Sequence, residues 1–505
     1  MNILDERKLE ISKRNAKKPI EALIRAECEF QEILSGCDYD NSEKYGYADE
    51  YNRSVRRTGR KEAVITGECT CGDISFMSII MDERFMIGTL SKANGERIAC
   101  AFEYATDKKL PVVAFCSGGG VRIQEGAEGL VQMAKIDAAL LRHGEKGLAY
   151  ISVLTDPTYG GTMASFGMMG DIIIAEPGAR IGFGGKKIVE TILHEKIPND
   201  FQTAEYALKN GGIDTICERK NMLHTITRLL RLLSSKSAEA PIFKQPVFDY
   251  VHKNALNIWR NIRKEEPVYD LDTLFSDVTY LHGDRISFDD PSLPCGIGII
   301  GGITTVFIAQ SKGKTLDEKI ANNFGMTRPE GYRKAMRMAR LAEKFKLPIL
   351  ILIDSPGAHP GNEAEKNNQS IAISECMMTL LKVKTPIVTI VAGEGCSGGA
   401  LALSISDKIA MFSESMYAVI SPESYAKIIY DSPTPNEGQL ARMNYTAADL
   451  YESTLIDDVL KQGNVEFNNS QIIDYYLYAL KCISKYSTRE LLNIRFNRIR
   501  NWGSK

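Results

Sequence analysis

Residues 109–120 read KLPVVAFCSGGG, and residues 346–357 read KLPILILIDSPG. In both stretches, Lys-Leu-Pro leads into a short apolar run that ends in a turn containing glycine. Such runs have the length of buried β-strands and fall short of the roughly 18 residues that a membrane span needs. Two matching strands, each followed by a turn, predict that the chain repeats one domain.

Other pairs of residues keep nearly the same spacing along the chain. Pro111 opens the first apolar run as Pro348 opens the second, and further matched positions follow both prolines. Several matched pairs at nearly one spacing argue for two copies of one domain rather than for a chance match. The further pairs are Gly160 with Gly398 and Asp171 with Asp407.

Each copy is predicted to be an α/β domain, because apolar runs that end in turns alternate with helical patterns. One predicted helix carries Leu130, Met133, Ala134 and Leu141 on one stripe, which we expect to cover a sheet. A linker is placed where small, polar and proline residues replace the apolar pattern. The predicted parts are a charged segment 1–44, a domain 45–233, the linker 234–250, a second domain 251–462 and a peripheral helical tail 463–505.

The composition is that of an ordinary globular protein. Of the 505 residues, 44% are hydrophobic and 25% are charged, and the formal net charge is −2. This balance excludes a disordered chain and a polycation, and it gives no general electrostatic reason to bind nucleic acid. The stretch 1–18 mixes both signs of charge and lacks the apolar core of a secretory signal. We therefore expect a cytoplasmic protein that binds neither a membrane nor nucleic acid.

The cysteines do not suggest a disulfide framework or a zinc site. There are eleven, an odd number, and they are scattered among apolar residues, which predicts reduced thiols. The closest pair, Cys69 and Cys71, is one residue too tight for the C-x₂-C spacing of zinc ligands, and the sequence has no second pair. No metal site is expected.

Four glycine-rich turns follow predicted strands, two in each copy. Glycine lets bare backbone N–H groups approach a ligand, and a helix that follows adds the positive end of its dipole. Such a turn is either an oxyanion site or only a tight connection, and two in each copy favour a functional site. The turns are Ser117–Arg122, Tyr159–Gly161, Ser355–Ala358 and Gly393–Ala400.

Three other motifs have simpler interpretations. Residues 395–399 fit the G-x-S-x-G pattern of serine hydrolases, but that fold needs a later histidine and none follows His359. A Gly-Lys-Thr triplet lacks the upstream glycine of a phosphate-binding loop. Lys312 and Lys314 beside it belong either to a solvated loop or to a contact with a ligand phosphate. We interpret His282 as a turn-stabilising side chain rather than as a base.

The sequence also lacks paired carboxylates, clustered metal ligands and a dinucleotide-binding fingerprint. A site built mainly from backbone donors suits a reaction in which a carbonyl becomes an oxyanion. In such a reaction the substrates can supply the acid and the base themselves.

The motifs together resemble the carboxyltransferase component of bacterial acetyl-CoA carboxylase, a family of the crotonase superfamily. The first copy, from about residue 61 to 233, resembles the β subunit, and the second, from about 255 to 460, resembles the α subunit. The first resemblance is carried by GGVRIQE at 119–125 and YISVLTDPT at 150–158. The second is carried by HGDR at 282–285, NFGM at 323–326, PEGYRKA at 329–335, DSPG at 354–357 and SGGALA at 397–402.

The resemblance implies two tandem crotonase-like domains, with the β- and α-like halves fused in one chain. It further implies a carboxyltransferase that moves CO₂ from carboxybiotin on a biotin carboxyl carrier protein to acetyl-CoA, giving malonyl-CoA for fatty acid synthesis. Biotin carboxylase would be a second partner, and no cofactor would be bound tightly. The chain would work as a homodimer or higher oligomer, because related enzymes place the site between crotonase domains.

The same resemblance assigns the site residues. In the first half, peptide N–H groups would hold the thioester oxyanion, and in the second half they would hold the ureido oxygen of biotin. Arg122 matches an arginine that lies near the acyl-CoA in relatives, or it is purely structural. The donors would be Gly119, Gly120, Gly160 and Gly161 in the first half and Gly357, Ala358, Gly398 and Gly399 in the second. Independently of the resemblance, Lys312, Lys314 and Arg328 are predicted as further substrate contacts.

The chain departs from the family in two places. The four-cysteine zinc ribbon of the β subunit is replaced by a charged stretch with lone Cys28 and Cys37. The turn at 117–120 reads SGGG where the family more often has SGGA, which leaves open which peptide groups donate. Alternatives are a propionyl-CoA-type carboxyltransferase or a biotin-dependent acyl-CoA decarboxylase subunit, a crotonase-type hydratase or hydrolase, and a scaffold that only binds a biotinylated carrier.

Overall fold

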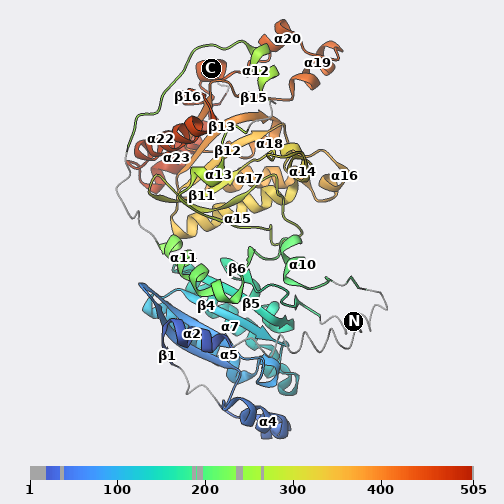
Figure 1. The fold of residues 1–505 in the computed structure, drawn as a ribbon, viewed down its shortest axis with the longest axis vertical. Helices are drawn as coiled ribbons and strands as arrows, with labels where there is room; N and C mark the ends of the chain where they lie inside the picture. The colour runs from blue at the N-terminus through green and yellow to red at the C-terminus, as the bar shows by residue number, and fades with distance from the viewer. Residues whose placement is uncertain are drawn as a thin grey trace. The chain divides into compact units, whose positions relative to one another are not determined.

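A computed structural model describes residues 19–33, 39–184, 200–234, 243–262 and 267–502, together with 189, 197 and 198. The chain forms two compact units, and each contains a sheet and helices (Figure 1). Unit 1 takes residues 1–209 and 213–233, and unit 2 takes residues 210–212 and 234–505. The stretch 1–18, Cys37 and the part 235–242 of the predicted linker lie outside the described residues.

Unit 1 is built on one mixed sheet, with strand order β1-β2-β3-β4-β5-β6-β8 and β7 paired with β5. The pairs β1–β2 and β2–β3 are antiparallel, and the pairs from β3 onward are parallel. The strands are β1 (Glu29–Glu32), β2 (Val64–Cys71), β3 (Ile74–Met81), β4 (Val112–Gly118), β5 (Tyr150–Tyr159), β6 (Ile172–Ala175), β7 (Ile181–Gly182) and β8 (Thr215–Ile216). The helices are α2 (Ile20–Glu27), α3 (Ser42–Tyr45), α4 (Ala48–Thr58), α5 (Lys92–Lys108), α6 (Gly126–Leu130), α7 (Gln132–Glu145), α8 (Gly160–Met163), α10 (Ala204–Lys209) and α11 (Met222–Ser234).

Unit 2 has a sheet of the same kind, with order β16-β14-β13-β12-β11-β10-β9 and β15 paired with β13. Its strands are β9 (Asp277–Tyr280), β10 (Cys295–Ile300), β11 (Ile303–Ala309), β12 (Ile349–Ser355), β13 (Ile387–Cys396), β14 (Lys408–Phe412), β15 (Met416–Ala418) and β16 (Asp458–Leu460). Its helices are α12 (Ala255–Asn261), α13 (Leu271–Leu274), α14 (Leu316–Ala321), α15 (Pro329–Phe345), α16 (Asn362–Lys366), α17 (Gln369–Lys382), α18 (Ser397–Leu401), α19 (Pro422–Tyr430), α20 (Glu437–Ala441), α21 (Ala447–Glu452), α22 (Val465–Ile483) and α23 (Thr488–Arg500).

The repeat predicted from sequence is present in the structure, element by element. Helix α5 matches α15, strand β4 matches β12, helix α7 matches α17 and strand β5 matches β13. The pairing of Asp171 with Asp407 is confirmed, because each carboxylate accepts the first N–H of the matched strand, at 2.9 and 2.8 Å. The match of Gly160 with Gly398 is wrong by one residue. When β5 is aligned with β13, the residue after each strand is Gly160 in unit 1 and Ser397 in unit 2.

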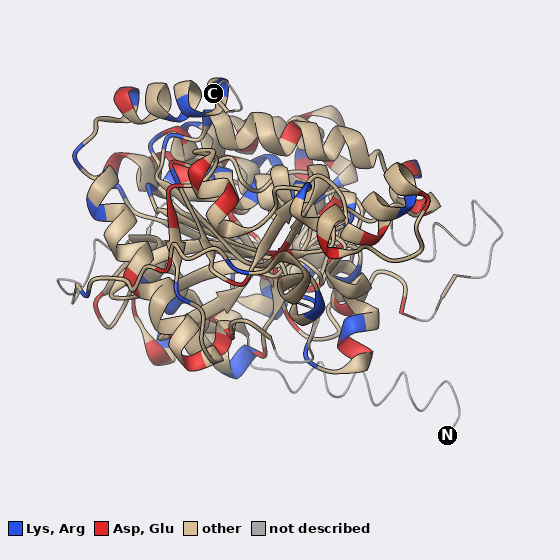
Figure 2. Cartoon of the chain, turned by 90° about the horizontal axis from the view of Figure 1, so that it is seen from above, with Lys and Arg blue, Asp and Glu red and all other residues tan. Residues whose placement is uncertain are grey.

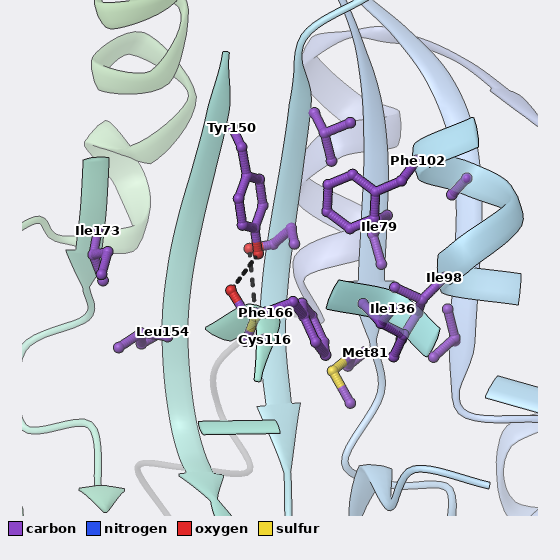
Figure 3. Close-up of a cluster of buried hydrophobic side chains, with 14 of the residues drawn as sticks. Ile79, Met81, Ile98, Phe102, Cys116, Ile136, Tyr150, Leu154, Phe166 and Ile173 are labelled. Carbon is purple, nitrogen blue, oxygen red and sulfur yellow. Dashed lines mark hydrogen bonds between the residues drawn. The ribbon is translucent and has the colours of Figure 1, made fainter. Parts of the chain in front are cut away.

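The central strands are buried along their whole length, as their continuous apolar runs predict. In unit 1, Ile79, Phe102 and Tyr150 belong to one cluster of buried side chains between β3, β4, β5 and helices α5 and α7 (Figure 3). The Tyr150 hydroxyl is satisfied in this core because it donates to the carbonyl of Phe166 at 2.9 Å. The core therefore packs β4 and β5 against helices α5 and α7.

Helix α7 covers its sheet with a different stripe from the predicted one. Its buried residues include Ile136, Ala139 and His143, whose imidazole lies within hydrogen-bonding distance, 3.0 Å, of the Leu110 carbonyl. Leu130 and Leu141 are 58% and 62% exposed, so the prediction that they face the sheet is wrong. The apolar pattern missed the buried stripe because that stripe includes a histidine, and an apolar residue lies on the outer face instead.

The C-terminal stretch is helical as predicted, but it is not peripheral to unit 2. Helix α22 buries Ile472, Tyr475 and Tyr476 in the core of that unit. Arg495 of α23 is fully buried and donates to both carboxylate oxygens of Asp407, at 2.8 and 2.7 Å, and to three backbone carbonyls. The sequence missed this role because the buried residue is an arginine.

Cys28 and Cys71 form a disulfide, so the prediction that all the cysteines are free is wrong for this pair. The described residues contain no group of three or more His, Cys, Asp or Glu arranged to hold a metal ion. Among the helices of the described chain, none combines the length and apolar character of a membrane span. Basic and acidic side chains are interspersed along the described helices (Figure 2), in line with the small net charge.

Candidate active site

The two glycine turns of unit 1 lie beside each other because β4 and β5 are neighbours in the sheet. Gly118 pairs with Thr158 at the ends of these strands. Gly120 and Gly160 have φ values of +106° and +54°, a region that favours glycine. A Cβ at Gly120 would lie 3.5 Å from both the Cα of Gly160 and the N of Gly161. The turns approach each other this closely because side chains are absent from both.

Backbone hydrogen bonds decide which N–H groups of unit 1 are left for a ligand. The N–H of Gly119 donates to the Ile87 carbonyl at 2.8 Å, and the N–H of Gly160 donates to the Phe183 carbonyl at 3.1 Å. Within the described chain, the N–H groups of Gly120, Val121 and Gly161 have no acceptor. Three unengaged donors from two strand ends thus converge in one place.

Unit 2 repeats the close approach of two turns, but its backbone hydrogen bonds differ from those of unit 1. The N–H of Gly357, where φ is +137°, donates to the Ser355 hydroxyl at 3.1 Å. The N–H groups of Ala358, Gly398 and Gly399 have no acceptor in the part of the chain that the structure describes. A Cβ at Gly399 would lie only 2.5 Å from the Ala358 nitrogen, so the two strand ends meet closely here as well.

Lys312 lies close to the turns of unit 2 and forms a cluster with Asp354 and Glu394, which shortly precede those turns in the sequence. Its ammonium is 2.7 Å from Asp354 Oδ1 and 2.8 Å from Glu394 Oε2. Asp354 also accepts the N–H of Glu394 at 2.9 Å. Burial acts to lower the pKa of Lys312, but the two carboxylates outweigh it and raise the pKa above its usual value. One ammonium against two carboxylates is a poor partner for a phosphate, and the structure therefore favours a structural role over the predicted phosphate contact.

The other predicted substrate contacts are distributed differently. Arg122 is fully buried, and its guanidinium is bonded to both carboxylate oxygens of Glu62, at 2.5 and 2.9 Å. This arrangement favours the structural alternative for Arg122. Lys314 lies on the surface, 2.8 Å from Asp270. Arg328 precedes helix α15 and donates to the side chain of Asn323 at 2.7 Å.

His282 lies in a turn of unit 2 and not at a glycine turn. Its Nδ1 is 2.9 Å from Asp289 Oδ2, and the other oxygen of that carboxylate accepts the N–H of Gly283 at 2.9 Å. Burial acts to raise the pKa of Asp289, but the bonds from His282 and Lys334 outweigh it and lower the pKa. The geometry agrees with a turn-stabilising role for the histidine.

A cavity of about 1030 Å³ opens in unit 2 beside the Lys312 cluster. Its volume is in the range of sites that bind small molecules and cofactors. Apolar and aromatic side chains line much of it. Phe324, Met326 and Pro356 lie in the motifs at 323–326 and 354–357, whereas the other apolar lining residues come from separate segments with no recognisable pattern. The lining includes Tyr269, Tyr280, Pro291, Pro294, Phe324, Met326 and Pro356, together with Lys312, Asp354 and Glu394.

Comparisons of the sequence give consistent results. A family model described as acetyl co-enzyme A carboxylase carboxyltransferase-like matches residues 226–503. The chain is 41% identical over 469 residues to the acetyl-coenzyme A carboxylase carboxyl transferase subunits beta/alpha of Clostridium tetani, covering 90% of this chain and 81% of that protein. It is 37% identical over 491 residues to the protein of the same description from Natranaerobius thermophilus, covering 91% and 81%.

Solved structures with the same fold are also carboxylating enzymes. A transcarboxylase 12S structure superimposes with a TM-score of 0.75 at 18% identity, covering 95% of this chain and 92% of that chain. A single-chain, multi-domain long-chain acyl-CoA carboxylase superimposes with a TM-score of 0.70 at 18% identity, covering 94% and 47%. These neighbours confirm the predicted fold class of two tandem crotonase-like domains.

Proposed function

This chain belongs to the acetyl-CoA carboxylase carboxyltransferase family, with β- and α-like halves in one chain, and we propose that its two units each hold one of the reaction's two oxyanions. The enzyme is a biotin-dependent carboxyltransferase that moves CO₂ from carboxybiotin to acetyl-CoA, giving malonyl-CoA for fatty acid synthesis. In the proposal, unit 1 holds the thioester oxygen of the acyl-CoA and unit 2 holds the ureido oxygen of biotin.

The observation that supports two oxyanion sites is the pair of turns with unengaged N–H groups at matched positions, and the family resemblance supplies the assignment of a substrate to each unit. When β4 is aligned with β12 and β5 with β13, Val121 matches Ala358, and Gly161 matches Gly398. Each of these N–H groups lacks an acceptor in the described chain. Preorganised donors of this kind stabilise charge that develops on an oxygen, because they need no reorganisation when the charge appears.

The donor set is narrower in this proposal than in the sequence assignment. Gly119 and Gly160 shape the first site but do not donate, since their N–H groups are already bonded to backbone carbonyls. In unit 1 the donors are the N–H groups of Gly120, Val121 and Gly161. In unit 2 they are those of Ala358, Gly398 and Gly399, while Gly357 shapes the turn.

The chain's contribution to the chemistry is binding, orientation and charge stabilisation. Carboxybiotin, when bound, supplies CO₂ and leaves a biotin anion that can take the proton from the acetyl methyl group. The donors of unit 1 stabilise the enolate oxygen that this proton transfer creates. The donors of unit 2 stabilise the ureido oxygen as negative charge grows on it. Each donor should contribute on the order of 10² to 10³ in rate.

Assembly between chains is part of the proposal, because both units expose apolar side chains at matched positions. Ile87 in unit 1 and Phe324 in unit 2 are 61% and 51% exposed, and Leu141 and Met378 are 62% and 50% exposed. Exposed apolar side chains that recur at matched positions of both units, one pair of them on helices α7 and α17, suggest that a partner covers them. A homodimer in which unit 1 of one chain meets unit 2 of another covers every copy of both surfaces at once.

The remaining partners follow from the reaction class. Biotin carboxyl carrier protein would deliver carboxybiotin, biotin carboxylase would regenerate it, and the chain itself would hold no tightly bound cofactor. The proposal also includes a cytoplasmic location. Eight of the described cysteines are free thiols, which fits a reducing compartment, although the Cys28–Cys71 disulfide runs against it.

The proposed function is tested by incubating the purified chain with biocytin and malonyl-CoA labelled in its free carboxyl group. We expect label to appear in carboxybiocytin, with acetyl-CoA as the second product. A propionyl-CoA-type enzyme would transfer label faster from methylmalonyl-CoA, and a decarboxylase would release the label as CO₂. A hydratase would instead hydrate crotonyl-CoA, and a scaffold would bind the carrier without moving label. Absence of label transfer at high enzyme concentration would contradict the proposal.

A further inference from the structure

The charged cluster beneath the turns of unit 2 has no counterpart in unit 1. In the alignment that matches β4 with β12 and β5 with β13, Ser117 stands where unit 2 has Asp354, and Pro157 stands where it has Glu394. Met77 is the first residue of β3 that pairs with β4, and Val306 is the first residue of β11 that pairs with β12. Glu83 and Lys312 each lie six residues further on, so Glu83 stands where unit 2 has Lys312. The same backbone turns therefore form without an ion cluster, and the cluster is not required to build the fold.

Asp354 and Glu394 each lie just before a turn that offers unengaged N–H groups. Asp354 is three residues before Gly357, and Glu394 is four residues before Gly398. Their carboxylates are largely buried, at 12% and 1% exposure, and both contact the ammonium of Lys312. One cation thus joins the bases of both turns.

Two glycines make room for this cluster. A Cβ at Gly393 would lie 2.3 Å from Asp354 Oδ1, and a Cβ at Gly325 would lie 2.9 Å from the Cγ of Lys312. The cluster also lines the cavity of unit 2, so it lies where a ligand would enter. The other charged groups around that cavity are Asp270, Asp272, Lys314, Glu318, Lys319 and Glu423, with the phenols of Tyr269 and Tyr280.

We propose that Lys312 is a positioning residue for the second substrate: its ammonium ties Asp354 to Glu394 and so fixes the spacing of the N–H donors of unit 2. This inference rests on the proposed assignment of biotin to that unit. Without Lys312, two buried carboxylates face each other and repel, and the turns that follow them move apart. A misplacement of about 1 Å at such a site costs about 10²-fold in rate.

The loss in rate expected on replacing Lys312 should depend on pH, because the residues of the cluster are charged. In the wild-type chain Lys312 stays protonated well above neutral pH, because its pKa is raised. In Lys312→Met, the neighbouring carboxylates lose the cation between them, and like charges repel more strongly as a rising pH favours the charged forms. Transfer to biocytin by this variant should therefore fall with rising pH over a range in which the wild type changes little.

The test measures label transfer from malonyl-CoA to biocytin at several pH values in Lys312→Met, Lys312→Arg and the double variant Lys312→Met/Glu394→Gln. We expect Lys312→Met to lose about 10²-fold in kcat/KM for biocytin at pH 8. The KM for malonyl-CoA should stay within about twofold, because unit 1 is untouched. Lys312→Arg should recover most of the loss, and the double variant part of it, since it restores the net charge of −1. The matched control is Glu83→Gln in unit 1, which should leave kcat/KM for biocytin unchanged.

The outcomes separate this inference from the proposed function. If wild-type enzyme transfers label and Lys312→Met transfers it equally well, Lys312 has no positioning role. An equal loss in Lys312→Met and the double variant, with no pH dependence, would also overturn the inference, because removal of a side chain alone would then explain it. If wild-type enzyme transfers no label, the proposed function fails instead. Circular dichroism and thermal unfolding of each variant establish that it is folded before its kinetics are compared.

Discussion

The glycine turns of unit 1 and unit 2 share one backbone and differ in what lies beneath them. Unit 1 has neutral Ser117 and Pro157 in the places where unit 2 has Asp354 and Glu394, bridged by Lys312. The repeated part supplies backbone donors that suit any oxyanion derived from a carbonyl. The part that is not repeated consists of side chains, which can distinguish one substrate from another. If the proposed roles hold, the comparison teaches that one repeated backbone supplies the donors while side chains outside the repeat position them in unit 2.

The largest effect on label transfer is expected when the glycine turn of one unit is blocked by a larger side chain. Gly161→Val would place its Cβ 2.6 Å from the Val121 side chain and 3.4 Å from the Val121 nitrogen. Gly399→Val would place its Cβ 2.5 Å from the Ala358 nitrogen. Because each change closes the space that a substrate oxygen needs, we expect either variant to lose at least 10² to 10³ in the rate of label transfer.

Binding measurements distinguish the two losses. In Gly161→Val, calorimetry should show weakened binding of malonyl-CoA, and in Gly399→Val that binding should be unchanged. Gly161→Ala and Gly399→Ala are the matched smaller changes and should give smaller losses. Full activity with unchanged Michaelis constants in either valine variant, in a chain that circular dichroism shows to be folded, would remove that turn from the site.

The two repeated α/β domains could be predicted from the sequence because both copies contain short apolar strands that end in glycine turns. The motif at 346–357 forms β12, which is buried along its length, and its copy at 109–120 forms β4 in the same position of the other sheet. The prediction failed where burial and polarity disagree. His143 and Arg495 are buried polar residues with hydrogen-bonding partners, and Leu141 is an exposed apolar residue. Periodicity alone assigns these to the wrong face.

The site was accessible from sequence only at the level of the turns. Whether a given peptide group is free depends on a partner far along the chain, as when Ile87 accepts the N–H of Gly119 and Phe183 that of Gly160. The bond between Cys28 and Cys71 joins cysteines 43 residues apart, and their spacing matched no known pattern. Lys312 was recognised as a candidate, but its two carboxylate partners come from separate strands, so their convergence needed the structure.

A complementation experiment sharpens the comparison by asking whether the two units work in the same chain. Chains with Gly161→Val keep an intact unit 2, and chains with Gly399→Val keep an intact unit 1. If each site takes unit 1 from one chain and unit 2 from another, mixing under conditions that exchange subunits should restore about a quarter to a half of wild-type label transfer, as expected for random pairing in a two-fold assembly. Gel filtration of labelled chains confirms that exchange has occurred. No recovery after complete exchange would show that each site is contained within one chain.

The smallest effect is expected where the two units differ in the turn itself. Position 160 is glycine in unit 1, and its match in unit 2 is Ser397, with φ of +65°. A Cβ at Gly160 would lie 3.0 Å from the Cα of Gly120, close enough to require a small shift of that turn. Gly160→Ser should cost about 1 kcal/mol, since a side chain in the left-handed region is disfavoured by roughly that amount, and lower the unfolding midpoint by about 2–4 °C. Activity should stay within about fivefold of wild type, because the Gly160 N–H is bonded to Phe183 and is not offered to a substrate.

Ser397→Gly is the reciprocal change and should alter stability by less than about 0.5 kcal/mol, because relief of backbone strain is offset by the greater freedom of glycine in the unfolded chain. A 10²-fold loss of transfer in folded Gly160→Ser would return that peptide group to the set of donors and make the two turns less alike than their backbones suggest.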